Sequence, residues 1–342
     1  MPVLKLKSLV WTEIGRIEVK DADMPTPDDN SVLLKVKDCG ICGSELSAYL
    51  GHNELRKPPS VMGHEFSGEV VGTGTHAPKE LVGKLVTVNP LVTCGKCRYC
   101  QNGDRQLCPE RKIIGINFPG GFDQFLSIPF YTVHEVKDPV YGSLAEPLAT
   151  AVRAVRTAGV TPGDQVMITG AGTIGLFCSK IASLSGASEI VMVETNKFRQ
   201  KLAVAYGATD AVHPEMLQEF IDKSGNKLGF DRAIDAVGYN TTRNAVVRYL
   251  RRGGNAVILG LHENKMDIDG NYVVRNEIKV AGSFCYSNDD FRVAVDIINK
   301  GYLAGSEKWF EIRKGGEVDE SFKELLKPES AVSKIILDIE HT

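Results

Sequence analysis

Four cysteines that fall within fifteen residues could together hold a metal ion. Two, two and seven residues separate Cys94, Cys97, Cys100 and Cys108. Four thiolates close a tetrahedral zinc shell and leave no position for a substrate, so the spacing predicts a structural zinc lobe at about residues 90–111. An iron–sulfur cluster uses similar ligands, but the charged residues between these cysteines are typical of a solvated loop. A disulfide framework suits a short secreted chain better than this one.

A second set of metal-binding side chains is scattered earlier in the chain. Cys39 and Cys42 form a Cys-x-x-Cys pair, and His64 is followed by Glu65. Each is weak evidence alone, because such a pair can be redox-active and a lone histidine or glutamate is more often structural. Together, Cys39, His64 and Glu65 would form an incomplete shell, which leaves a position for water or an alcohol as catalytic zinc requires. Zinc there would lower the pKa of a bound alcohol and favour loss of hydride.

A glycine-rich turn follows an apolar segment and begins a helical one. It consists of Gly170, Ala171, Gly172, Thr173, Ile174 and Gly175. The glycines allow close approach to a pyrophosphate, and the helix N-terminus supplies N–H donors. Glu194 ends the next apolar segment, where it could bind the adenosine ribose and repel the extra phosphate of NADP. NAD is therefore favoured, with NADP kept open by Lys197 and Arg199, and a turn without any ligand is the other interpretation.

The arrangement of apolar residues indicates which elements position these groups. Residues 1–150 contain short alternating segments between Gly and Pro, including 31–36 and 84–88, which predicts a largely β domain. From residue 151 the pattern predicts alternating strands and helices, and hence a doubly wound parallel sheet. The expected strands are 165–169, 190–194, 232–236 and 256–259, and the expected helices are 173–185, 197–206 and 241–250. A helix near 290–300 and a helix end plus strand near 331–339 could pack back on the first domain.

The bulk composition excludes several classes of function. A chain of 342 residues favours two domains, and 43% hydrophobic with 24% charged residues is ordinary for a globular protein. The net charge of −3 comes from 40 basic and 43 acidic residues without long runs of one sign, which argues against nucleic-acid or membrane binding. Charged residues throughout the N-terminal segment argue against a signal peptide. We therefore expect a cytoplasmic protein with a small-molecule partner.

These motifs, in this order, resemble those of the zinc-containing medium-chain alcohol dehydrogenases. The stretch Gly63-His64-Glu65-x2-Gly68-x5-Gly74 is similar to the family's zinc signature, and the cysteine lobe, Gly121-Phe122, Glu146-Pro147 and the glycine turn follow in the family's order. The resemblance covers nearly the whole chain. It implies a GroES-like catalytic domain of residues 1–150 and 286–342, a Rossmann domain of residues 151–285 inserted in it, and an active site in the cleft.

The resemblance also implies a set of zinc ligands. Cys39 and His64 would bind the catalytic zinc, with Glu65 as a ligand or near neighbour. Glu146 stands where simple alcohol dehydrogenases usually have a cysteine as third protein ligand. A carboxylate at this place resembles the sorbitol, threonine and sugar dehydrogenase branch, which implies a homo-oligomer, a tetramer rather than a dimer.

A proton relay and the nicotinamide site are implied in the same way. Ser44 matches the family hydroxyl that takes the alcohol proton. In the sorbitol-type pattern Asp and then His follow, whereas this chain has Glu45 and Ser47, so the rest of the relay is open to His52 or a water chain. Three loops after apolar segments would approach the nicotinamide, at Val237, Leu259 and Ser283.

The predicted function is NAD-dependent oxidation of a secondary alcohol of polyol, sugar or threonine-like kind to a ketone, with a catalytic and a structural zinc in each chain. A simple alcohol dehydrogenase or an aldehyde or ketone reductase of the same family is the alternative. A zinc-free reductase of the quinone-reductase branch is disfavoured by both metal-binding sets. A non-catalytic scaffold that binds NAD and zinc would explain the altered positions after Ser44, and finding no turnover would favour it.

Overall fold

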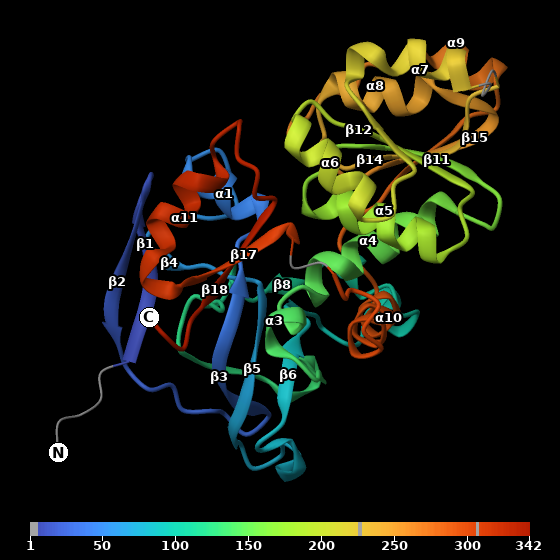
Figure 1. The fold of residues 1–342 in the computed structure, drawn as a ribbon. Helices are drawn as coiled ribbons and strands as arrows, with labels where there is room; N and C mark the ends of the chain where they lie inside the picture. The colour runs from blue at the N-terminus through green and yellow to red at the C-terminus, as the bar shows by residue number, and fades with distance from the viewer. Residues whose placement is uncertain (1–5, 225–227, 306–307) are drawn as a thin grey trace. The chain divides into compact units, whose positions relative to one another are not determined.

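The computed structural model describes residues 6–224, 228–305 and 308–342 (Figure 1). The first five residues of the predicted domain 1–150 lie outside the described residues. The chain divides into two compact units, one formed by Met1–Glu146 with Ser287–Thr342 and the other by Pro147–Tyr286. The first unit is therefore built from both ends of the chain, and the second from its middle.

The first unit consists mainly of strands. A three-stranded sheet has the order β2-β1-β4, and a larger sheet has the order β10-β6-β5-β3-β18-β17, with β9 also paired to β3. A short β7-β8 pair lies apart from both. The strands are β1 (Leu6–Glu13), β2 (Arg16–Ala22), β3 (Ser31–Gly40), β4 (Ser60–Val61), β5 (Glu65–Thr73), β6 (Leu85–Val88), β7 (Leu91–Val92), β8 (Lys112–Ile113), β9 (Phe125–Pro129), β10 (Val133–Glu135), β17 (Phe310–Lys314) and β18 (Lys334–Asp338).

The returning C-terminal segment completes the large sheet. β18 runs antiparallel to β3, with Leu337 opposite Cys39, and parallel to β17. This confirms that the segment near 331–339 contains a strand, although no helix ends there within the described residues. The helices of this unit are α1 (Gly43–Tyr49), α2 (Arg98–Gln101), α3 (Pro139–Gly142), α10 (Asn288–Asn299) and α11 (Val318–Leu325), and α4 (Ala145–Ala158) begins at its boundary.

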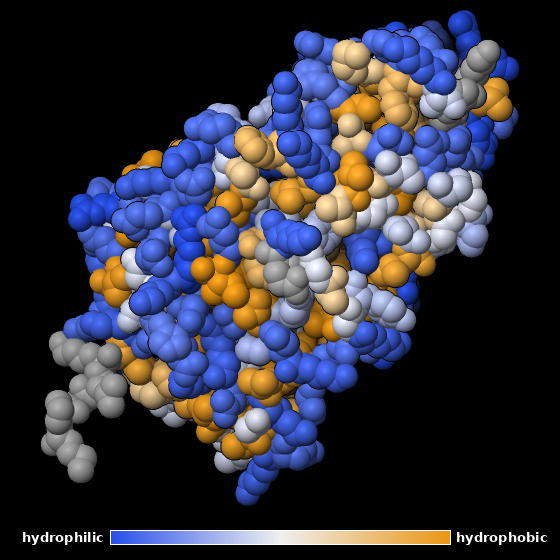
Figure 2. All heavy atoms as spheres, in the orientation of Figure 1, coloured by the Kyte–Doolittle hydropathy of each residue, from blue (hydrophilic) through white to orange (hydrophobic). Residues whose placement is uncertain are grey.

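The core of the first unit lies between these sheets and α11. Alternate residues of β3, namely Val32, Leu34 and Val36, are fully buried, as the period-two pattern of the segment requires. Phe322 of α11 packs on Phe122 with ring centroids 6.1 Å apart. On the face in Figure 2, hydrophobic side chains are interspersed with hydrophilic ones, which is ordinary for a folded chain.

Asp38 is a carboxylate buried in the large sheet, opposite Asp338 of β18. Burial, together with the charges of Asp338 and Asp138, raises its pKa from 3.8 to about 7. Because the folded state favours the protonated form, its contribution to stability is complete below pH 3.8 and is lost as the pH rises through about 7. Above that pH the buried charge opposes folding.

We therefore expect Asp38→Asn to stabilise the protein at pH 8 by about 2 to 4 kcal/mol and to change little at pH 4. Thermal denaturation of the variant and the wild type at both pH values measures this difference. Glu13→Gln, an exposed change in β1, is the matched control. Equal stabilisation at the two pH values would contradict the assignment to Asp38 ionisation.

The second unit is a parallel six-stranded sheet with helices on both faces. Its strand order is β13-β12-β11-β14-β15-β16. Figure 1 shows α7, α8 and α9 along one side of the sheet and α5 along the other. The elements are β11 (Gln165–Thr169), α5 (Thr173–Leu184), β12 (Glu189–Val193), α6 (Lys197–Ala205), β13 (Asp210–Val212), α7 (Leu217–Ser224), β14 (Phe230–Asp235), α8 (Asn240–Arg248), β15 (Leu250–Ile258), α9 (Gly270–Arg275) and β16 (Lys279–Gly282).

The predicted fold class is confirmed, since a doubly wound parallel sheet is inserted in a largely β unit. The strand order reverses beside β11, whose neighbours are β12 on one side and β14 on the other. Ligands of open parallel sheets bind outside the carboxyl ends of strands at such a switch point. Within the described residues, no helix has the length and apolar content needed to cross a membrane.

Candidate metal and cofactor sites

The cysteine lobe brings its four predicted ligands together. The sulfur atoms of Cys94, Cys97, Cys100 and Cys108 all lie within 4.8 Å of one another, and none forms a disulfide. Backbone N–H groups of Lys96 and Cys97 lower the pKa of the Cys94 thiol to about 7, so the thiolate that zinc requires is favoured. The donor set therefore fits a closed zinc shell.

We expect Cys94→Ser to remove this structural zinc and to lower the melting temperature by roughly 5 to 10 °C, because the lobe has little apolar packing of its own. Metal analysis together with thermal denaturation measures both effects. Cys178→Ser, at a buried cysteine outside either cluster, is the control for loss of a thiol alone. A variant that kept all its zinc would contradict the assignment.

The second metal-binding group contains Cys42, not Cys39. Ligand atoms of Cys42, His64 and Glu65 lie within 4.8 Å of one another. Cys42 is the N-cap of α1, Glu65 is the first residue of β5, and His64 immediately precedes it. The prediction that Cys39 belongs to this group is wrong: Cys39 is a fully buried residue of β3, paired with Phe66 and Leu337 in the sheet. Burial raises the pKa of its thiol, which disfavours a thiolate.

Glu45 orients His64 within this group. Its Oε1 lies 2.8 Å from His64 Nδ1 and accepts a hydrogen bond from the N–H of Gly63 at 2.9 Å, and its Oε2 accepts one from the N–H of Cys42 at 3.0 Å. Burial alone would raise the pKa of Glu45, but His64 and Arg56 lower it to about 2. The ionised carboxylate requires Nδ1 to carry the proton, which leaves Nε2 as the donor atom for a metal.

Glu65 has a buried cationic partner from the other end of the chain. Lys334 of β18 is 1% exposed, and its Nζ contacts Glu65 Oε2 and donates to the carbonyl of Ile41 at 3.0 Å. Burial would lower the pKa of Lys334, but Glu65 and Cys42 raise it. Glu65 therefore lies beside the metal-binding group as half of an ion pair.

Ser44 lies in the first turn of α1, beside an arginine that the sequence patterns do not single out. Arg56 is buried, and its Nη1 donates to Ser44 Oγ at 3.2 Å. Its Nε donates to the carbonyl of Gly115 at 3.4 Å, and its Nη2 lies 3.3 Å from His64 Nδ1. The Ser44 hydroxyl donates to Cys42 Sγ at 3.4 Å. The hydroxyl predicted to take the alcohol proton thus faces the metal-binding group and a fixed positive charge.

Two other residues considered for this site are not members of that group among the described residues. Glu146 is in the first turn of α4 and is not a member of the Cys42 cluster among the described residues. Its role as a ligand stays a prediction. His52 is exposed and its backbone N–H donates to the carbonyl of Ser47.

The glycine turn of the second unit fits a dinucleotide. Gly170 has φ +85°, which favours glycine, and a Cβ at Gly175 would overlap the Gly170 carbonyl. A Cβ at Gly172 would meet nothing within 4 Å, so the backbone there is open to a pyrophosphate. Thr173 and Ile174 follow as the first residues of α5, whose N-terminal amides suit an anion.

The residues predicted to bind the rest of the cofactor follow neighbouring strands. Glu194 follows β12, is 8% exposed and accepts a hydrogen bond from the N–H of Ala171 at 2.7 Å. Arg199 lies in the first turn of α6. The hydroxyl of Ser283, just after β16, is buried without a hydrogen-bond partner in the described residues, as expected of a group kept for a ligand. Val237 and Leu259 follow β14 and β15.

Comparison with known proteins decides the family. Residues 28–138 match the alcohol dehydrogenase GroES-like domain, and residues 173–300 match the zinc-binding dehydrogenase domain. The chain is 32% identical to L-galactonate-5-dehydrogenase of Escherichia coli (strain K12), covering 87% of this chain and 86% of that protein. This chain belongs to the zinc-dependent alcohol dehydrogenase family. The resemblance drawn from its motifs is thereby confirmed.

Two further relatives of this dehydrogenase bear on its enzyme class and its cofactor. L-threonine 3-dehydrogenase of Vibrio cholerae serotype O1 is 31% identical, covering 82% of this chain and 84% of the relative. A Sinorhizobium meliloti 1021 protein assigned as a zinc-binding dehydrogenase, solved bound to NADP, is 29% identical with a TM-score of 0.89, covering 98% of this chain and 100% of the other. The dehydrogenase is thus a zinc-dependent oxidoreductase that uses a nicotinamide cofactor.

Proposed function

We propose that this dehydrogenase oxidises a secondary alcohol of a polyol, sugar acid or threonine-like compound to the ketone, with NAD as the cofactor. The Cys42–His64–Glu65 group, in which Cys42 is half-buried and His64 is oriented by Glu45, carries the proposal. The L-galactonate and L-threonine dehydrogenases among its relatives support the substrate class. We also propose a cytoplasmic homo-oligomer, a tetramer rather than a dimer; its thiolate clusters suit a reducing compartment.

The side chains of this site have distinct roles in the proposed reaction. When bound, zinc supplies a Lewis acid and NAD a hydride acceptor. Cys42 and His64 hold the metal, and Glu45 keeps the histidine in the tautomer that can bind it. Ser44 would accept the hydroxyl proton of the alcohol as it passes its own proton on toward solvent, and the Arg56 guanidinium would stabilise negative charge that develops on the serine oxygen during this transfer.

A substrate panel tests the proposal directly. NADH formation by the zinc-loaded protein is followed with L-galactonate, L-threonine, sorbitol, 2,3-butanediol and ethanol, with NAD and NADP in parallel and His64→Ala as the inactive control. We expect turnover of at least one secondary alcohol and none by the variant. Turnover of ethanol alone would favour a simple alcohol dehydrogenase. No turnover by a protein that binds both zinc and NAD would favour a non-catalytic scaffold.

Glu194 is the basis for proposing NAD. We expect Glu194→Gln to raise KM for NAD about tenfold, because a charged hydrogen bond to the ribose is worth about 1.5 to 3 kcal/mol. KM for NADP should fall, since the repulsion of the phosphate is removed. Steady-state kinetics with both cofactors measure the ratio, and Glu189→Gln, at the other end of β12, is the control. An unchanged ratio of the two KM values would refute this role.

A further inference from the structure

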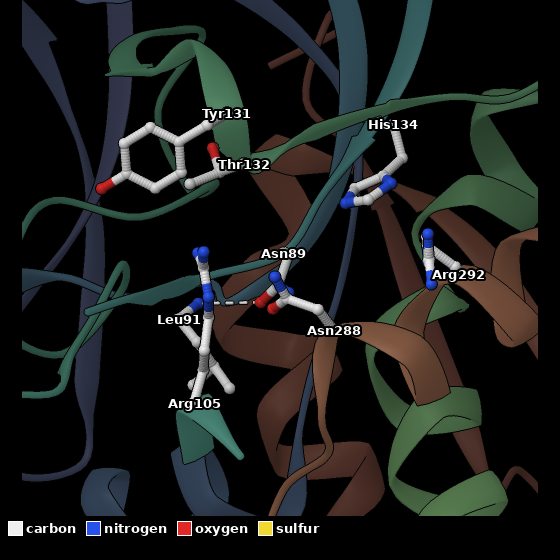
Figure 3. A pocket seen from close by; sticks show the side chains of 8 residues that line it. All are labelled: Asn89, Leu91, Arg105, Tyr131, Thr132, His134, Asn288 and Arg292. Carbon is white, nitrogen blue, oxygen red and sulfur yellow. Dashed lines mark hydrogen bonds between the residues drawn. The ribbon is translucent and has the colours of Figure 1, made fainter. Parts of the chain in front are cut away.

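A polar cavity of about 270 Å³ lies in the first unit and shares no lining residue with either metal-binding group. Its walls come from four places in the sequence (Figure 3). They are the end of β6, the 3-10 turn Arg105–Leu107 of the cysteine lobe, the segment from the turn Phe130–Thr132 into β10, and the start of α10. The residues that the argument uses are Asn89, Arg105, Tyr131, His134, Asn288 and Arg292.

The charged side chains that line the cavity are cationic. Arg105 and Arg292 both contribute guanidinium groups, and no carboxylate is among the lining residues. Arg292 donates to Asp289 at 2.8 Å, but this is an exposed pair within one helix, which screens the charge only in part. The Arg105 guanidinium has no hydrogen-bond or ion-pair partner among the described residues, although the Arg105 carbonyl accepts from the N–H of Cys108. A guanidinium group without a partner among the described residues therefore borders the cavity.

One neutral polar side chain of the cavity wall is fixed as a donor. Asn89 is 5% exposed, and its Oδ1 accepts from the N–H of Leu91 at 3.0 Å, which fixes the amide. Its Nδ2 is thereby directed toward Asn288 at 3.5 Å and the cavity. In Figure 3 the Tyr131 and His134 side chains lie on either side of this space, and the Tyr131 hydroxyl points away from Asn89 and Asn288.

The environment of His134 favours the neutral form of its ring. Its ring packs on Phe291, with centroids 5.0 Å apart, and no hydrogen bond to the ring is present within the described part of the chain. Burial lowers its pKa, and the nearby positive charge of Arg292 lowers it further. An anion in the cavity would raise the pKa of the His134 ring and favour the imidazolium. The pKa of His134 can therefore report whether an anion is bound.

We propose that this cavity binds a small oxyanion, a phosphate or carboxylate group, at Arg105, Arg292 and the Asn89 amide. Guanidinium groups form paired, charge-assisted hydrogen bonds with both kinds of group. The volume lies just below the usual range for small-molecule sites, about 300 to 1,000 Å³, so it suits an inorganic or small organic anion and not a dinucleotide. A bound anion would contact both the cysteine lobe, through Arg105, and α10, through Arg292. Binding would therefore stabilise the folded first unit by mass action.

Titration of the zinc-loaded protein with inorganic phosphate tests this site, with sodium chloride at equal ionic strength as the reference. Calorimetry should detect one phosphate per chain, and the melting temperature should rise with phosphate and not with chloride. Arg105→Gln should weaken binding about tenfold. Arg98→Gln, at an exposed arginine of the same lobe that does not line the cavity, should leave it unchanged. Parallel titrations with acetate and citrate distinguish a carboxylate from a phosphate ligand.

NMR titration of His134 supplies a second readout that needs no arginine variant. Phosphate should raise the pKa of the His134 ring in the wild type, with the resonance assigned by its loss in His134→Asn. Binding that Arg98→Gln weakens as much as Arg105→Gln would overturn the proposal. Failure of all three anions to bind at about 10 mM, or a His134 pKa unmoved by bound phosphate, would also overturn it.

Discussion

Replacing Cys42 with alanine should remove the active-site zinc and lower kcat/KM by about 10³-fold or more, a barrier increase of about 4 kcal/mol. Cys42 is the thiol that lies with His64 and Glu65. Metal analysis of the purified variant, together with its steady-state kinetics, measures both losses. The cysteine lobe should keep its zinc, so the metal content should fall without disappearing.

Cys39→Ala is the matched control, since this thiol is three positions away and fully buried in β3. We expect it to keep both metals and to lose only about 1 to 2 kcal/mol of stability from the small cavity left behind. If Cys39→Ala lost the active-site zinc while Cys42→Ala retained it, the ligand assignment made from the structure would be wrong.

Lys334→Met should destabilise the protein by about 3 to 5 kcal/mol, because it leaves the buried carboxylate of Glu65 without its cation. Thermal denaturation of the zinc-free and zinc-loaded forms measures the loss. The loss should be larger without zinc, since the metal would supply a positive charge near Glu65.

The double variant Lys334→Met with Glu65→Gln separates pairing from packing. If the lysine acts by neutralising Glu65, the double variant should recover at least half of the lost stability, because no buried charge is left unpaired. Lys323→Met, an exposed lysine of α11, is the control for loss of one surface charge. Additive losses in the double variant would contradict the pairing.

Local patterns in the sequence predicted the parts of the sites that local structure forms. The cysteine lobe was predictable because all four thiols lie in one loop, whose own turns bring them together. The glycine turn and Glu194 were placed correctly on their elements for a similar reason, since each follows a strand with a clear apolar pattern. Which cofactor contacts these residues make stays a prediction.

The residues that were missed depend on contacts distant in sequence. An alternating segment was expected at 31–36, which would leave Cys39 in a loop. The strand instead continues to Gly40, because β5 on one side and β18 on the other pair with Asp38, Cys39 and Gly40. That pairing buries Cys39 and brings Cys42 to the metal-binding group. Nothing in the local sequence specifies a partner strand almost three hundred residues away.

Contacts distant in sequence also explain the differences at β15, Arg56 and Glu45. The pattern for 256–259 captured only the end of β15, which starts at Leu250 because that residue pairs with Phe230. Arg56 gave no sequence signal, since it acts from a loop through single hydrogen bonds to Ser44 and Gly115. Glu45 stood out only as a departure from the expected Asp, and the structure explains it as the partner of His64.

The pairing of Glu65 with Lys334 also sets a time order for biosynthesis. The two residues are separated by 269 positions, and the whole second unit is encoded between them. At about 5 to 20 residues per second, the ribosome delivers the lysine roughly 15 to 55 s after the glutamate. During that interval the nascent first unit lacks both β18 and the cation that neutralises its buried carboxylate. The metal-binding pocket can therefore reach its final structure only after translation of the second unit, and until then a bound zinc ion is the other cation that could neutralise Glu65.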